Sequence, residues 1–180
     1  DAMDCSFPSP YALSENALIY LPSNIPEPSD TNFTEIMLEE TSPLLKLVSG
    51  GVFYLFTSHH ALNQARNWFA SKQTLIEGRT LLIQGDSPRD EMLKEFRSHG
   101  NAILLGTGSF WEGVDVRGEA LSMVIIDKLP FKSPADPLMM ARLEYIKKNG
   151  GNGFIDHQLP TAVLALKQGV GRLLRDQKDF

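Results

Sequence analysis

One short segment, KQGVGRLLR at residues 167–175, combines the residue types that can bind a polyphosphate. On an α-helix, with about 100° between successive residues, Gln168, Arg172 and Arg175 fall within about 60° of one another. Guanidinium groups stay charged and match phosphate oxygens two at a time, so this stripe suits a phosphoryl group. Gly171 lies beside the stripe and lets a ligand or another backbone come close. The alternative is an amphipathic surface helix whose arginines are solvated.

The glycine-rich segment GTGSFWEGVDVRG, residues 106–118, is a second candidate because it directly follows the apolar run at residues 102–105. Its glycines permit tight backbone turns near a ligand. The carboxylate of Asp115 can accept a hydrogen bond from a ribose hydroxyl, and Thr107 and Ser109 can donate to phosphate oxygens. The alternative is a glycine-rich turn at the end of a strand. The segment is not a dinucleotide fingerprint, since the G-x-G-x-x-G spacing is absent.

A third candidate, FTSHH at residues 56–60, stands at the expected start of a helix. Thr57 and Ser58 are typical caps of a helix amino end. The same position also binds phosphate, through free backbone N–H groups and the helix dipole. His59 and His60 are adjacent and therefore point apart, and no acid stands at ligand spacing, so we expect no metal site here.

Two parts of a complete ATP site are absent from the sequence. It contains no G-x-x-x-x-G-K-[ST] loop and no acidic pair after a strand that would hold Mg²⁺. Its single cysteine, Cys5, excludes a disulfide framework, a cysteine-based zinc site and a cysteine-ligated cluster formed by this chain alone. A reducing, cytoplasmic location is the expectation, and the apolar runs are too short to span a membrane.

An alternation of strands and helices must position these candidates. Short continuous apolar runs predict strands, and helical periodicity between them predicts helices. This order is typical of a parallel sheet covered by helices on both faces, in which ligands bind at the carboxyl ends of the strands. The expected strands are residues 52–56, 81–83, 102–105 and 122–126, and the helices begin at 57, at 87 and before 163.

Local signals define the helix ends. A capping box at residues 87–90, with Pro88 at the first helical position, begins the second helix, and Gly100 ends it. The glycines at 149–153 indicate a turn rather than a phosphate loop. We expect the last helix to dock its apolar face on the sheet, through Val163, Leu166, Val170, Leu173 and Leu174.

The charge of the chain is unevenly distributed. The 180 residues carry a formal charge of −5, with 42% hydrophobic residues, which is ordinary for one globular domain. Residues 1–50 hold eight acids and one base, whereas residues 51–180 hold sixteen bases and fourteen acids. The net negative charge of the chain therefore does not exclude a local nucleic-acid site. We expect a single domain with an irregular, acidic lead-in at 1–50, including a short strand at 17–21 and a helix over 33–48, and an α/β core at 51–180.

Several of these segments resemble motifs of the DinG/YoaA family, superfamily 2 helicases related to XPD. GTGSFWEGVDVRGEALSMVIIDKLPF resembles motif V and the strand after it, KQGVGRLLRD resembles motif VI, and FTSHHAL resembles motif IV. SPRDEMLKEF and GGNGFIDHQLP also fit the family. The resemblance implies the second RecA-like motor lobe: a parallel sheet flanked by helices, related to P-loop NTPases but without a phosphate loop of its own.

The resemblance also implies roles for the matching residues. One group reaches ATP held on the other lobe: Gln168, Arg172 and Arg175, with Arg175 or Arg172 as an arginine finger. Gly113 and Asp115 contact the ribose side of the nucleotide with Glu112 nearby, and Gly171 also belongs to the nucleotide site. A second group holds the phosphates of single-stranded DNA: Thr57, Ser58, Thr107 and Lys128.

For the whole protein, the resemblance implies an ATP-dependent DNA helicase that moves 5′→3′ in DNA repair or replication. Its first lobe, on the same polypeptide, would bind most of the ATP and Mg²⁺ and would carry a 4Fe–4S cluster. Because the phosphate loop and the magnesium-binding acids of the first lobe are absent, we expect this chain to be inactive by itself. A strand expected after motif VI is missing too, so we interpret the chain as truncated there. The alternatives are a non-catalytic RecA-like module that binds nucleic acid or protein, and a free-standing nucleotide-binding enzyme.

Overall fold

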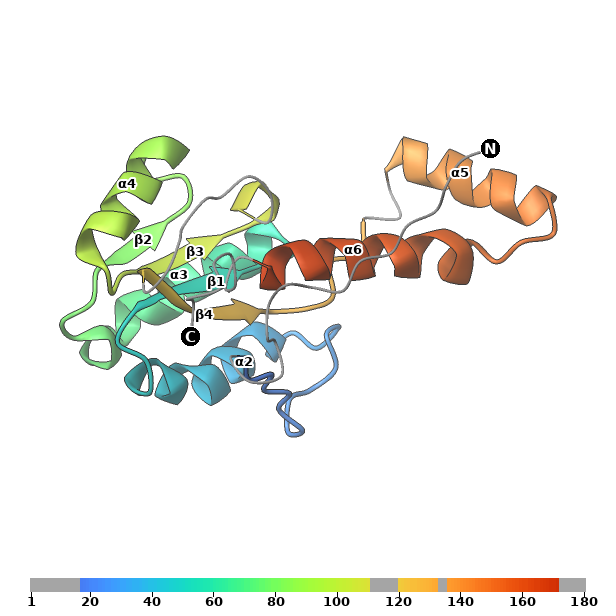
Figure 1. Cartoon of the computed structure of the whole chain (residues 1–180). Helices are drawn as coiled ribbons and strands as arrows, with labels where there is room; N and C mark the ends of the chain where they lie inside the picture. Colours follow the sequence, from blue (N-terminus) through green and yellow to red (C-terminus); the bar gives the residue numbers. More distant parts are fainter. Residues whose placement is uncertain (1–16, 111–119, 133–135, 172–180) are drawn as a thin grey trace.

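The computed structural model describes residues 17–110, 120–132 and 136–171. Its centre is a sheet of four parallel strands in the order β2-β3-β1-β4 (Figure 1). The strands are β1 (Gly51–Leu55), β2 (Leu81–Ile83), β3 (Ile103–Gly106) and β4 (Leu121–Ile126). The predicted α/β class and all four predicted core strands are confirmed, with ends shifted by one residue in three of them.

The helices alternate with the strands along the chain. After α2 (Phe33–Thr41) comes the 3₁₀ turn η1 (Ser42–Lys46), and α3 (His59–Ser71) is followed by η2 (Gln73–Ile76). Next come α4 (Arg89–His99), the 3₁₀ turn η3 (Gly108–Phe110), α5 (Pro137–Lys148), the π-helical turn η5 (Phe154–Gln158) and α6 (Leu159–Val170). Among the described residues, no helix is long and apolar enough to cross a membrane.

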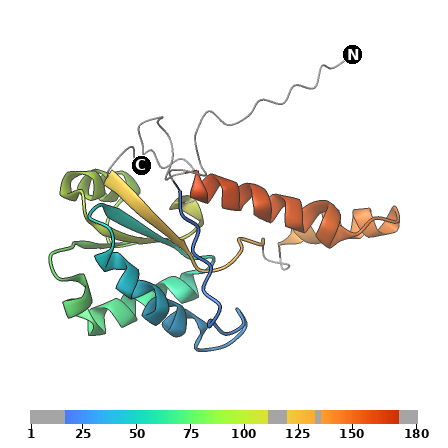
Figure 2. The same cartoon turned by 60° about the horizontal axis from the view of Figure 1, so that its bottom comes forward.

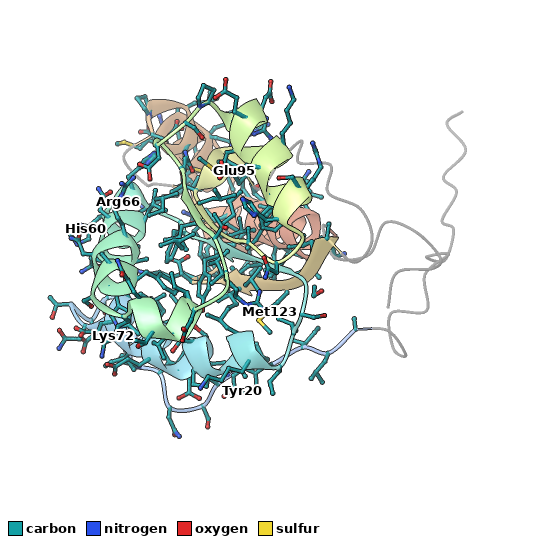
Figure 3. All side chains as sticks on the ribbon, turned by 90° about the vertical axis from the view of Figure 1, so that its left-hand side faces the viewer. Tyr20, His60, Arg66, Lys72, Glu95 and Met123 are labelled. Atoms are coloured by element: carbon teal, nitrogen blue, oxygen red, sulfur yellow. The ribbon has the colours of Figure 1, made fainter. Side chains whose placement is uncertain are left out.

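Alternating side chains of the sheet form two separate cores. Helices α2 and α3 cover one face, where Tyr54 packs edge-on against Phe69 with ring centroids 5.6 Å apart. Helix α4 covers the other face, where Phe53 and Phe96 lie 4.7 Å apart (Figures 1 and 2). The continuous apolar runs of the strands follow from this arrangement, because both faces are buried. In Figure 3 the side chains fill the space between these layers.

Gly51 at the start of β1 is needed for this packing. A Cβ atom there would lie 2.3 Å from the Phe96 ring and 2.4 Å from the carbonyl oxygen of Ala120. The second neighbour is backbone, which cannot move aside as a flexible side chain does. The glycine pair at 50–51 therefore does more than end the preceding helical segment, since Gly51 lets α4 approach the sheet.

The amino ends of the strands are joined by one arginine. Arg79, just before β2, donates from Nη1 to the carbonyl oxygens of Gly50 at 2.8 Å and Asn101 at 3.0 Å. Its Nη2 donates to Leu45 at 3.0 Å and also to Val48. A planar guanidinium suits this task, because it offers five donors in fixed directions.

Three local expectations were wrong. Residues 17–21 form no strand and are largely exposed; there the hydroxyl of Tyr20 donates to Glu40 Oε1 at 2.7 Å instead of joining a sheet. The helix expected over 33–48 ends at Thr41 and continues as η1, whose first turn contains a proline. The capping box does not form, since Pro88 occupies the cap position of α4 and no side chain caps it.

The apolar face of the last helix does not dock on the sheet. Helices α5 and α6, joined through η5, extend to one side of the sheet (Figures 1 and 2), and we call residues 137–170 the arm. Val163 and Val170 remain 39% and 38% exposed. Leu166 is half-buried, and the buried residues of α6 are the small Ala162 and Gly169, not the larger apolar side chains. Leu173 and Leu174 lie outside the described residues.

Candidate nucleic-acid interface

A polar residue follows each of the four strands, directly or, for β1, after Phe56. In sheet order these are Gln84 after β2, Thr107 after β3, Thr57 after β1 and Asp127 after β4. The register places Leu55, Gly106 and Ile126 level with one another, so β1, β3 and β4 end together. We call this side of the sheet the carboxyl edge, which is where ligands of parallel sheets bind.

Thr57 and Asp127 connect the ends of β1 and β4. The Thr57 N–H donates to Asp127 Oδ1 at 3.0 Å, and the Thr57 hydroxyl lies 3.3 Å from Asp127 Oδ2, to which it donates. Asp127 is only 7% exposed, and this burial raises the pKa of its carboxyl group to about 6. The hydrogen bonds from Thr57 and the charge of Lys128 act in the opposite direction but do not outweigh burial.

Thr107 and Gln84 make an equivalent pair between β3 and β2. Gln84 Oε1 accepts from the Thr107 N–H at 2.6 Å and from its hydroxyl at 3.1 Å. The Thr107 carbonyl accepts a hydrogen bond from the Phe110 N–H at 2.8 Å, and this bond closes the turn η3. A Cβ at Gly106 would lie 2.8 Å from the Phe110 ring, so the glycine allows this tight return. The ends of β2 and β3 are thus joined through the neutral side-chain oxygen of Gln84.

The amino end of α3 lies beside the Thr57–Asp127 pair. Ser58 is the N-cap residue, with extended backbone, and its Oγ accepts from the Ala61 N–H at 3.1 Å. His59 and His60 occupy the first turn and are exposed, and Figure 3 shows His60 on the outer side of α3 with Arg66 and Lys72. The uncapped amides and the helix dipole make this end suitable for a phosphate.

Lys128 is engaged with the segment that precedes α2. Its Nζ donates to the Pro28 carbonyl at 3.0 Å and lies 4.8 Å from the centroid of the Phe33 ring. The half-buried ammonium group therefore holds the lead-in against the end of β4. Its expected contact with DNA stays a prediction.

The residues expected at the nucleotide are only partly within the described chain. Gln168 and Gly171 are exposed at the end of α6, where the Gly171 N–H donates to the Lys167 carbonyl at 2.8 Å. The others, Glu112, Gly113, Asp115, Arg172 and Arg175, lie outside the described residues. That the arginine stripe faces the glycine-rich segment therefore stays a prediction.

Sequence reasoning identified the two threonines and placed Asp127 at a strand end, but it gave Asp127 no role and did not identify Gln84. Both stand directly after buried apolar runs, a position that could have singled them out. Within the described ranges, no three His, Cys, Asp or Glu side chains gather closely enough to hold a metal ion. A shallow cleft between α3 and β2, lined by Arg66, Phe69 and Ile83 among others, contains none of the candidate residues.

Comparisons with known proteins agree with this architecture. Residues 41–180 match the model of the helicase C-terminal domain. A solved structure, S. tokodaii Xpd4, superposes with a TM-score of 0.62 at 19% identity over 87% of this chain and 31% of that one. At that identity the superposition shows the fold: a parallel sheet flanked by helices, as in an XPD helicase domain.

Curated relatives match nearly the whole chain. The ATP-dependent DNA helicase YoaA of Escherichia coli is 44% identical over 96% of this chain, and the ATP-dependent helicase DinG of Mycobacterium tuberculosis is 36% identical over 95%. The 3′-5′ exonuclease DinG of Bacillus subtilis is 38% identical over 95%. The chain spans 26%, 25% and 19% of their respective lengths. It belongs to the helicase C-terminal domain family, and the resemblance to the DinG and YoaA proteins is confirmed.

Proposed function

We propose that this chain is the second motor lobe of an ATP-dependent DNA helicase. The observation that carries the proposal is the meeting of two helicase motifs at the carboxyl edge. Thr57, in the segment resembling motif IV, donates two hydrogen bonds to Asp127, which follows the strand after motif V. The identity to YoaA over 96% of the chain supports the same assignment.

Single-stranded DNA would run along the carboxyl edge. Its phosphates would lie near Thr57, Ser58, Thr107 and Lys128, which come from three neighbouring strand ends. Among these, Ser58 combines exposure with a position at a helix amino end, and it accepts a hydrogen bond without giving its own hydroxyl hydrogen to any described residue. The edge would therefore bind phosphate mainly through neutral donors, with Lys128 as the one charged residue among these four.

ATP with Mg²⁺ would be bound mainly by the first lobe. Gln168, Arg172 and Arg175 would approach it from this lobe, and an arginine finger is worth about 10³–10⁵ in rate. Gly113 and Asp115 would contact the ribose side with Glu112 nearby, and Gly171 would lie at the nucleotide beside the arginines. The chain by itself is expected not to hydrolyse ATP, because its sequence has no phosphate loop. ATP binding would close the two lobes and hydrolysis would reopen them, which moves this lobe along the strand.

Further properties follow only from the family and are part of the proposal. They are 5′→3′ movement, a role in DNA repair or replication, a 4Fe–4S cluster in the first lobe and action in the cytoplasm. The relative named 3′-5′ exonuclease DinG shows that a similar domain also occurs in a protein named for a different activity.

The test is ATP hydrolysis by the full-length protein with and without single-stranded DNA. We expect DNA-stimulated turnover that falls by a factor of about 10³ or more in Arg175→Ala, while binding of single-stranded DNA persists. If Arg175→Ala keeps its turnover, the finger is elsewhere and Arg172→Ala is the next variant. An intact wild type without turnover would instead favour the binding module, and a 3′-labelled strand in the same reaction reports any exonuclease activity.

A further inference from the structure

Thr57 uses both of its hydrogen-bond donors on one buried carboxylate. Its N–H donates to Asp127 Oδ1 at 3.0 Å and its hydroxyl donates to Oδ2 at 3.3 Å. A hydroxyl group has a single hydrogen, so Thr57 in this arrangement has no donor left for a phosphate. The contact with DNA at this point must then come from its neighbours in the chain.

The neighbour on the carboxyl side is the cap of α3. Ser58 has φ −144° and ψ 150°, and this extended residue turns the chain from β1 into the helix. The direction of its hydroxyl and of the first amides of α3 therefore depends on where Thr57 is held. Asp127 is itself fixed, because its N–H donates to the Leu55 carbonyl at 3.1 Å and its side chain is buried.

We propose that Asp127 is a positioning residue of the DNA site. By accepting both donors of Thr57 it fixes the turn between β1 and α3, so that Ser58 and the first amides of α3 face the phosphate. This inference rests on the proposed function, because it assigns Asp127 a role at the DNA edge of the motor lobe. It makes Thr57 part of the support and Ser58 the residue in contact.

The charges around Asp127 are few in the described part of the chain. Lys128 follows it in sequence, and its charge lowers the carboxyl pKa. His59 and His60 belong to the first turn of α3, which begins two residues after Thr57. Both histidines are present in every variant, so pH effects of Asp127 must be measured as differences between variants.

Two substitutions separate the hydrogen bonds of Asp127 from its charge. Asparagine keeps an oxygen that accepts from the Thr57 N–H, and its amide N–H can donate to the Thr57 hydroxyl oxygen. Asp127→Asn therefore keeps the pair without the charge, whereas Asp127→Ala removes both. Glu95→Gln is the matched control, since Glu95 is a carboxylate on α4, away from the carboxyl edge (Figure 3).

The experiment measures DNA-stimulated ATP hydrolysis of the full-length protein over a range of oligothymidylate concentrations. For Asp127→Ala we expect the half-stimulating DNA concentration to rise about tenfold or more, with the rate at saturating DNA within about twofold of wild type. Asp127→Asn should stay within about threefold of wild type near neutral pH, and the control should not change. DNA affinities measured by fluorescence anisotropy with the same oligonucleotide should rank the variants in the same order, with Asp127→Ala the weakest.

A double-mutant comparison tests whether Thr57 acts through Asp127. Thr57→Val, which removes only the hydroxyl, should weaken DNA binding in the wild-type background and add nothing to Asp127→Ala. Near pH 5.5, where the wild-type carboxyl is mostly protonated, wild type and Asp127→Asn should become indistinguishable. The histidines are common to both proteins and cancel in this comparison.

Three outcomes would overturn the inference. In the first, Asp127→Ala needs the same DNA concentration for half-stimulation as wild type. In the second, Asp127→Ala and Asp127→Asn weaken DNA binding equally. In the third, the effects of Thr57→Val and Asp127→Ala on DNA binding add in the double mutant. If Asp127→Ala does not fold, the other two variants decide. The inference then requires that Asp127→Asn binds DNA as wild type does and that Thr57→Val binds DNA more weakly. Weaker binding by Asp127→Asn together with unchanged binding by Thr57→Val would overturn it. A wild type without DNA-stimulated hydrolysis refutes the proposed function instead.

Discussion

The sheet with its covering helices and the arm are both rich in apolar residues, but they bury them to very different degrees. In β1 every residue is buried, and the helices on both faces contribute side chains to two cores. In the arm, α5 buries only Met139, and α6 buries only Ala162 and Gly169. An apolar stripe thus predicts a face that needs covering, but it does not predict that the chain's own sheet covers it.

The largest effect is expected in the sheet, at Phe96. This α4 side chain is fully buried and packs on Phe53 and against Gly51. Phe96→Ala should lower the free energy of unfolding by about 3–5 kcal/mol, because it removes a large ring and leaves a cavity. Chemical denaturation of the chain gives the value. A loss below about 1 kcal/mol would mean that the sheet is packed as loosely as the arm.

An intermediate effect is expected between the two regions, at Asp127, which directly follows β4. Burial raises the pKa of this carboxyl from 3.8 to about 6, so the folded chain binds the proton more tightly than the unfolded chain. The resulting stabilisation is complete below the unfolded pKa and is lost as pH rises through about 6, by at most about 3 kcal/mol. Denaturation at a series of pH values should show wild type losing stability relative to Asp127→Asn on going from about pH 4 to 7. A constant difference would contradict the raised pKa.

The smallest effect is expected in the arm. Leu164 on α6 is 59% exposed, so Leu164→Ala removes little buried surface and keeps a good helix former. The free energy of unfolding of the chain should change by less than about 0.5 kcal/mol. A loss comparable to that of Phe96→Ala would show that the side chain is covered, and would abolish the contrast between arm and sheet.

The fold was largely predictable because its strands are buried on both faces. The run VFYLF around β1 and the glycine after α4, which has φ +69°, are signals contained in a few neighbouring residues. The apolar run at 17–21 has the same composition as a strand but stays exposed, because no strand pairs with it. Local composition identifies a candidate strand, whereas pairing is decided by the rest of the chain.

The candidate site was predictable only in part, because the partners of its residues come from distant parts of the chain. Thr57 and Ser58 stand at a helix start that the sequence marks, but their surroundings come from elsewhere. Asp127 lies 70 residues from Thr57 and Gln84 lies 23 residues from Thr107. Hydrogen bonds over such separations leave no periodic pattern, so only the sheet order reveals them. Arg172 and Asp115 lie outside the described residues, and their predicted proximity stays a prediction.

At the opposite side of the sheet, the four carbonyl contacts of Arg79 have a consequence for how the domain opens. The contacts come from η1 and the turn after it, from Gly50 just before β1, and from Asn101 in the turn between α4 and β3. None of these segments can separate from the others while the guanidinium stays in place. Their backbone amides should therefore exchange with solvent together, in one cooperative event, so that a single side chain defines the limits of an unfolding unit.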